Sequence, residues 1–289
     1  MLEDHDPLPP GDVREPPLSA ALQAYALDQL IQMEAQLRRR GRQRHAGIHE
    51  ARKAARRFRS VVLLGTGAAQ TAAAEAAVAI RLVCKRLSRL RDAHVVSELA
   101  SAGPAGLDAA SMKLLRQRLK QVRDELAEEL LQRDPELRRK RRKVHKARTA
   151  LLAEPWPALS AEGLLLALRR NAARMHKAQR DAEKTDSLAL RHRWRRRVRR
   201  LRVQLQILAE IGHDKAWPAT TRAAAKWVLA EAADCMPSVD ELRALGDALG
   251  QQQDRALLRS AVRRAFGPPQ REVLLQLLQP GRSKKTVRP

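Results

Sequence analysis

The chain has 289 residues, with 57 Lys and Arg against 32 Asp and Glu, a formal net charge of +25 and a hydrophobic content of 44%. These values fit a globular chain and argue against a disordered one, but charge on this scale opposes compaction unless a polyanionic partner offsets it. No apolar run approaches the roughly 18 residues that a membrane span needs. We therefore expect a soluble, cytoplasmic protein with a polyanionic partner and no membrane partner.

The chain opens on an acidic, proline-rich segment, residues 1–18, which is typical of a flexible leader, and closes on a basic tail, residues 281–289. Between them, residues 19–280 are rich in Ala, Leu, Arg, Gln and Glu and show little strand patterning, which predicts a single all-α domain. A Pro-containing break suggests two halves, at about 19–152 and 160–280.

Two local signals refine this helical pattern. The stretch from about 107 to 152 reads as one long helix or two joined ones, with Pro135 as the expected break. Ser238 followed by Glu241 predicts an N-cap that opens a helix near residue 239.

A histidine-led basic pattern occurs once in each half, in "IHEARKAARRFRS" (48–60) and in "LRHRWRRRVRRLR" (190–202). At about 100° per residue, the basic residues of the first copy fall within about 80° of its histidine, and apolar residues gather on the opposite side. Each copy is therefore predicted to be an amphipathic helix with a cationic front. The first stripe is His49, Arg52, Lys53, Arg56, Arg57 and Arg59, and the second stripe is His192, Arg195, Arg196, Arg199, Arg200 and Arg202.

A charged helix face is most often simply solvated. Here the six-position match argues against that interpretation, because a solvated face has no need of register. Arginine suits phosphate because its planar guanidinium donates two parallel hydrogen bonds. His49 and His192 should be neutral beside these arginines unless an anion binds, and the alternative is a half-buried histidine bonded to the backbone. Both interpretations of the histidines stay open at this level.

A weaker repeat aligns "LSRLRDAHV" (87–95) with "LGQQQDRAL" (249–257). The order is the same in both halves, a basic helix and then a Leu-rich helix with a late aspartate. We expect two similar halves about a pseudo-twofold axis, which can bring the two stripes to one cleft. Asp92 and Asp254 are expected to hold arginines in place. Further candidates for the site are Lys85, Arg89, Arg174, His176 and Lys177.

Catalytic motifs are missing from the sequence. Gly65-x-Gly67 follows an apolar run, as in a dinucleotide fingerprint, but position 70 is Gln70 and the run is expected to end a helix. The chain offers no phosphate-binding Gly-Lys-Ser/Thr loop and no cluster of metal ligands for phosphoryl transfer. We therefore expect no catalytic residues, no metal, no cofactor and no enzymatic activity. A metal-dependent phosphohydrolase is the competing hypothesis, which phosphate release with added Mg²⁺ would support.

Aromatic residues make up only 2% of the chain, and none is interleaved with exposed basic residues. Proteins that bind single-stranded nucleic acid usually stack bases on aromatic side chains, and readers of duplex DNA usually add Asn or Gln among the basics. A ligand made only of phosphates fits better. A nucleic-acid-binding protein that uses phosphate-backbone contacts is the alternative.

Together, the two stripes, "LRDAHV" near residue 90 and the stretch from Leu249 to Asp254 resemble the CHAD family, the conserved histidine α-helical domain, over roughly residues 19–280. The resemblance implies two four-helix halves around a basic central cleft or pore, binding of inorganic polyphosphate and, in bacteria, attachment to polyphosphate granules. The sequence differs from the family pattern in the basic segment before His192, where "NAARMHK" has no Tyr although the family often carries one. Oligomeric state and chain-length preference are not encoded in any motif.

Overall fold

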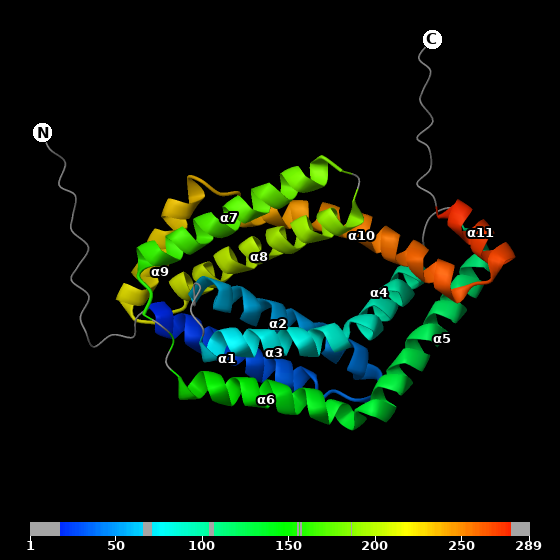
Figure 1. The fold of residues 1–289 in the computed structure, drawn as a ribbon, viewed down its shortest axis with the longest axis horizontal. Coiled ribbons are helices and arrows are strands. Elements are labelled where there is room, and N and C mark those ends of the chain that lie inside the picture. The colour runs from blue at the N-terminus through cyan, green and yellow to red at the C-terminus, as the bar shows by residue number, and fades with distance from the viewer. Residues whose placement is uncertain are drawn as a thin grey trace, which may run out of the picture.

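The computed structural model describes residues 18–65, 71–103, 107–154, 156, 158–185 and 187–278 (Figure 1). These residues form helices and contain no strand, so the predicted all-α class is confirmed. In chain order the elements are α1 (Leu18–Gln36), η1 (Gly41–Gln43), α2 (Arg44–Gly65), α3 (Ala72–Arg86), α4 (Ser88–Ala102), α5 (Ala109–Arg133), η2 (Pro135–Leu137), α6 (Arg138–Ala153), α7 (Ala161–Glu183), α8 (Leu188–His213), α9 (Ala219–Ala233), α10 (Val239–Ala265) and α11 (Pro268–Leu277).

Helices α2 and α8 lie side by side in the middle of the molecule (Figure 1). Helix α1 packs along α2, and α7 packs along α8. Helices α3 and α6 pack against each other on the side of α2 that faces away from α8 (Figure 1). The two predicted basic helices are therefore neighbours in space although they belong to different halves of the chain.

The larger of two hydrophobic clusters joins α1, α2, α3 and α6 to α7, α8, α9 and the start of α10. It is built mainly from Leu, Ala and Val, as so low an aromatic content requires. Phe58 is completely buried in it, and Trp194 is half-buried against it, so the predicted apolar backs of the two basic helices form part of the core. Full burial of a side chain such as that of Phe58 stabilises the fold by about 1.5 to 3 kcal/mol.

The second hydrophobic cluster lies at one end of the molecule and joins α4 and α5 to α10 and α11 (Figure 1). Leu115 and Leu119 of α5 meet Leu258 and Val262 of α10 there. The Arg118 Nε atom also donates a hydrogen bond of 3.2 Å to the carbonyl oxygen of Ala265. Segments from different halves of the chain thus share one small core.

The local sequence signals are confirmed. Helix α5 ends just before Pro135, and α6 begins after the short η2 turn, in which Glu136 and Leu137 adopt positive φ values of 53° and 57°. Ser238 and Glu241 form the predicted capping box at the start of α10.

The apolar run before Gly65 is the end of α2, as expected, rather than a strand. Gly67 and Gln70 lie outside the described residues. So do the predicted leader, except for Leu18, which is buried at the start of α1, and the predicted basic tail. Among the described helices, none combines the length and apolar character needed to cross a bilayer.

Gly47 sets how closely α2 can approach the end of α1. A Cβ atom at this position would lie 2.5 Å from the carbonyl oxygen of Gln36 and 2.9 Å from the Cβ atom of Arg39. Backbone cannot yield as a flexible side chain can, so a residue without a Cβ is required here. This contact fixes the position of the first stripe, which begins shortly afterwards at His49.

Candidate polyanion-binding site

The two stripes occupy the faces of α2 and α8 that the core leaves free. On α2 the buried residues Ala51, Ala55 and Phe58 alternate with the basic positions at helical spacing, and on α8 Val198 and Leu201 do the same. Lys53, Arg56, His192 and Arg196 are exposed. Most other stripe residues are half-buried: His49, Arg52, Arg57, Arg59, Arg199, Arg200 and Arg202.

A buried polar bridge holds the two stripe helices together. Gln204 of α8 is fully buried, and its Nε2 atom donates a hydrogen bond of 3.0 Å to the carbonyl oxygen of Ser60 on α2. Its Oε1 atom accepts one of 3.2 Å from Asn171 Nδ2 on α7. Because both polar ends of this amide are satisfied inside the core, the bridge favours one relative position of α2, α7 and α8. No local sequence pattern indicates this bridge, because its partners lie 33 and 144 residues from Gln204.

Charge repulsion connects the two stripes. Burial and then the neighbouring Arg52 lower the pKa of Arg56 to about 10. Burial, then Arg195 and then Arg56 itself lower the pKa of Arg199 to about 10. The guanidinium groups of α2 and α8 are thus close enough to disfavour one another's charge.

The same repulsion extends along both helices. Burial, then Arg197 and then Arg59 lower the pKa of Arg200 to about 10. The pKa of Arg59 is lowered chiefly by burial, with repulsion from Arg81 and Arg196 adding to it. In the described residues, the only carboxylate ion-paired with a stripe residue is Glu50, which lies 3.4 Å from Lys53 Nζ and 3.7 Å from His49 Nε2.

Two equivalent arginines, one in each stripe, are already bonded to the protein. Arg52 Nη1 donates to the carbonyl oxygen of Cys84 and, at 3.1 Å, to Ser88 Oγ. Arg195 is only 9% exposed, and its Nη1 atom donates at 2.6 Å to Gln253 Oε1 on α10. The sequence pattern treated the six positions of a stripe alike, but these two guanidinium groups brace the neighbouring helices.

His49 is half-buried, and its pKa is lowered by burial and then by Arg91; Glu50 opposes this lowering, and Arg56 and Lys53 add smaller contributions to it. The expectation of a neutral imidazole in the free protein agrees with this direction. In the described part of the chain, His49 makes no hydrogen bond to the backbone. His192 is exposed on α8, and its charge acts on the carboxyl group of Asp92.

The predicted aspartates lie among the arginines. Burial raises the pKa of Asp92, and Arg52 and Arg91 oppose that rise. The charge of Asp254 opposes the lowering of the pKa of both Arg195 and Arg199. Both carboxyl groups therefore act on the stripe arginines electrostatically, in keeping with the supporting role predicted for them.

The outer candidates differ in how the structure connects them to the stripes. Arg174 of α7 is exposed, and its charge lowers the pKa of Arg197 and Arg200, so it adjoins the second stripe. The other outer candidates lie on three helices: Lys85 on α3, Arg89 on α4, and His176 and Lys177 on α7.

Three cationic residues near the stripes were not among the candidates. Arg81 acts on Arg59, Arg91 acts on His49, and Arg197 acts on Arg200. Arg197 falls on the predicted apolar side of α8, and Arg81 and Arg91 come from α3 and α4, so only the packing of helices reveals their position.

Two hollows lie apart from the stripes, one along α5 and one between α7, α8 and α10. Within the described ranges, no three His, Cys, Asp or Glu side chains are grouped as a metal site would need.

The family model for the CHAD domain matches residues 21–263. Because this match spans most of the chain, the protein belongs to the CHAD domain family. No curated protein and no solved structure matches the chain.

Proposed function

We propose that this protein binds inorganic polyphosphate, without turning it over, in a basic cleft formed by the two stripes. The observation that carries the proposal is the gathering of like charges where α2 packs on α8: Arg56 lowers the pKa of Arg199, and Arg196 lowers that of Arg59. Like charges held together in a fold cost stability, and a polyanion offsets that cost. Arg56 also reaches solvent although protein surrounds most of it, as expected of a residue lining a cleft.

The repeat supports a pseudo-twofold arrangement of the halves. The number of residues between the starts of α1 and α7 nearly equals the number between the starts of α2 and α8. Arg56 and Arg199 occupy the same position of the repeat, and equivalent residues meet one another close to a twofold axis. A linear phosphate polymer crossing this axis would find equivalent donors on both sides.

Family membership also favours polyphosphate as the ligand. No aromatic side chain projects from the stripes to stack a base, since Phe58 and Trp194 point to the core. A purely phosphate ligand asks only for charge-assisted hydrogen bonds, which guanidinium groups provide. We further propose that the protein acts in the cytoplasm at polyphosphate granules.

Competition tests this proposal. Labelled long-chain polyphosphate would be bound at about 0.15 M salt, where loose surface attraction is screened, and challenged with duplex DNA and single-stranded RNA. We expect polyphosphate to remain bound against excess nucleic acid, and no phosphate release with Mg²⁺. Ready displacement by DNA or RNA would favour nucleic acid as the ligand, and phosphate release would show an enzyme.

We expect polyphosphate affinity to rise as pH falls, because the pKa of His49 lies below its usual 6.5 in the free protein and a bound polyanion would raise it. At pH values between the pKa of His49 in the free protein and its higher pKa in the complex, binding takes up a proton. The affinity therefore rises as pH falls from about 7 into the acid range. Titrations at several pH values should show a rise of a few fold, and His49→Gln should flatten it. An unaltered pH dependence in that variant would contradict the role of His49.

A further inference from the structure

Helix α6 carries a second concentration of positive charge that the stripes do not use. Eight of its residues are Lys or Arg and none is acidic. Val144, Ala147 and Leu151 are buried where the helix packs on α1 and α3, and Lys140 is buried beside Asp134 at the end of α5. Of the other cations, Arg141 and Arg148 are half-buried at the edge of this packed side, and the rest are exposed.

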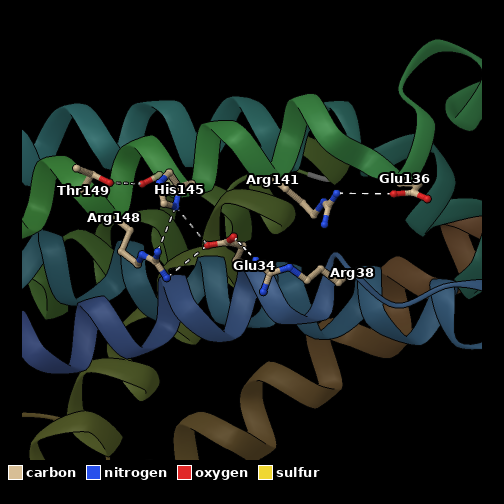
Figure 2. Close-up of polar contacts among 7 residues, drawn as sticks. All are labelled: Glu34, Arg38, Glu136, Arg141, His145, Arg148 and Thr149. Atoms are coloured by element: carbon tan, nitrogen blue, oxygen red, sulfur yellow. Dashed lines mark hydrogen bonds and ion pairs between the residues drawn. The ribbon is translucent and has the colours of Figure 1, made fainter.

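The inward-facing cations are matched by carboxylates. Figure 2 shows Glu34 of α1 between Arg38 on one side and Arg148 with His145 on the other. Glu34 Oε1 lies 2.6 Å from Arg38 Nη2, and Glu34 Oε2 lies 3.5 Å from Arg148 Nη1. Glu136 similarly lies 3.9 Å from Arg141 Nη2. These carboxylates fasten α6 in place, so the inner charges have a structural use.

The outward-facing cations have no such partners. Four of them are exposed, and their side chains make no ion pair or hydrogen bond within the described residues. We name these four the α6 outer face: Arg139, Arg142, Lys143 and Lys146. At 1.5 Å per residue they extend about 10 Å along the helix. Their repulsion is uncompensated in the free protein.

The α6 outer face is separate from the stripes. Helix α6 packs on α1 and α3, whereas the stripes meet where α2 packs on α8. In Figure 1, α6 runs along the lower edge of the molecule, with α3 and α1 between it and α8. A phosphate chain held between the stripes therefore leaves the α6 outer face free.

We propose that the α6 outer face binds a second stretch of polyphosphate, so that one protein molecule joins two polyphosphate chains. This inference rests on the proposed function of the stripes. The face offers only Arg and Lys, and α6 has no Phe, Tyr or Trp to stack a base. Leu152 is a lone exposed apolar residue near the end of α6, too little to enter a lipid surface. Phosphate without bases or lipid is the ligand that this chemistry recognises.

A two-chain capture assay tests the inference. The full-length protein would be loaded on an immobilised polyphosphate tether too short to reach from the stripes round to α6, washed at about 0.15 M salt, and offered dye-labelled long-chain polyphosphate. The test variant is Arg139→Gln/Arg142→Gln/Lys143→Gln/Lys146→Gln. The matched control removes four exposed charges elsewhere, Lys113→Gln/Lys120→Gln/Lys226→Gln/Arg263→Gln.

We expect the unaltered protein and the control to capture the labelled chain. The α6 variant should hold the tether within about threefold of the unaltered protein but capture at least about tenfold less labelled chain. Undiminished capture by the α6 variant would overturn the inference, since a second copy's stripes would then hold the chain. Capture of duplex DNA in preference to polyphosphate would also overturn it. If the unaltered protein does not retain the tether at all, the proposed function itself fails.

Discussion

Replacing Arg56 and Arg199 together by Gln is expected to weaken polyphosphate binding by about a hundredfold. Each guanidinium would lose charge-assisted hydrogen bonds to phosphate, and tenfold per residue corresponds to about 1.4 kcal/mol. The same change should leave stability unaltered or raise it, because burial and repulsion from neighbouring arginines already lower both pKa values to about 10. Binding titrations at about 0.15 M salt and thermal unfolding would measure the two effects.

The control for that experiment removes the same charge from a distant surface. Lys113 and Lys120 are exposed on α5, and Lys113→Gln/Lys120→Gln should change affinity by no more than about threefold. Equal losses in the two double variants would show that only overall charge matters. A loss of affinity accompanied by lower stability would show that Arg56 and Arg199 support the fold rather than the ligand.

Lys140→Met is expected to destabilise the fold by about 2 to 3 kcal/mol, because it leaves the carboxylate of Asp134 buried and unpaired. The side chains of Lys140 and Asp134 are 9% and 4% exposed, and Lys140 Nζ lies 2.9 Å from Asp134 Oδ2. The pair lies just beneath the surface, with few protein atoms around it. The loss of stability on breaking it is therefore expected to be small for a buried ion pair. Chemical denaturation at pH 7 would measure it.

The double variant Asp134→Asn/Lys140→Met should recover most of the loss, since no charge is then left unpaired and the amide oxygen can still accept from the backbone N–H of Arg139. The pH dependence gives a second check. Burial raises the pKa of Asp134, but hydrogen bonds from Lys140 and from the backbone of Arg139 lower it by more. The net pKa lies below the usual range. The ion pair therefore stabilises above the ordinary carboxyl pKa of about 4, and its contribution is lost as pH falls through the lowered value. A Lys140→Met cost that persisted unchanged in acid would contradict this account.

Features that depend on neighbouring residues were predictable from the sequence. The spacing of Ala51, Ala55 and Phe58 defines the buried side of α2, and therefore also its cationic side. Pro135 ends α5 because proline cannot continue a helix without losing a hydrogen bond. The two left-handed residues that follow it were not predictable, because Glu136 and Leu137 carry no glycine-like signal for positive φ.

Features that depend on distant partners were not predictable. Arg52 and Arg195 match the other stripe positions in sequence, and only the neighbouring helices show that they are bonded to Cys84 and Gln253. Gln204 interrupts an apolar pattern, but nothing local indicates that its amide reaches Ser60 in the other half of the chain. The contributions of Arg81 and Arg91 likewise depend on how α3 and α4 pack.

The shared core of α4, α5, α10 and α11 has a consequence for the order of folding during synthesis. Leu115 and Leu119 emerge from the ribosome long before Leu258, Val262 and Leu274, which complete their cluster. Contacts of such sequence separation form late and slowly, and chains fold from the N-terminus as they are made. Until α10 and α11 are made, the apolar side of α5 is therefore covered only by α4. Chaperone dependence should be greatest in that interval, and it should end only once α11 has been made.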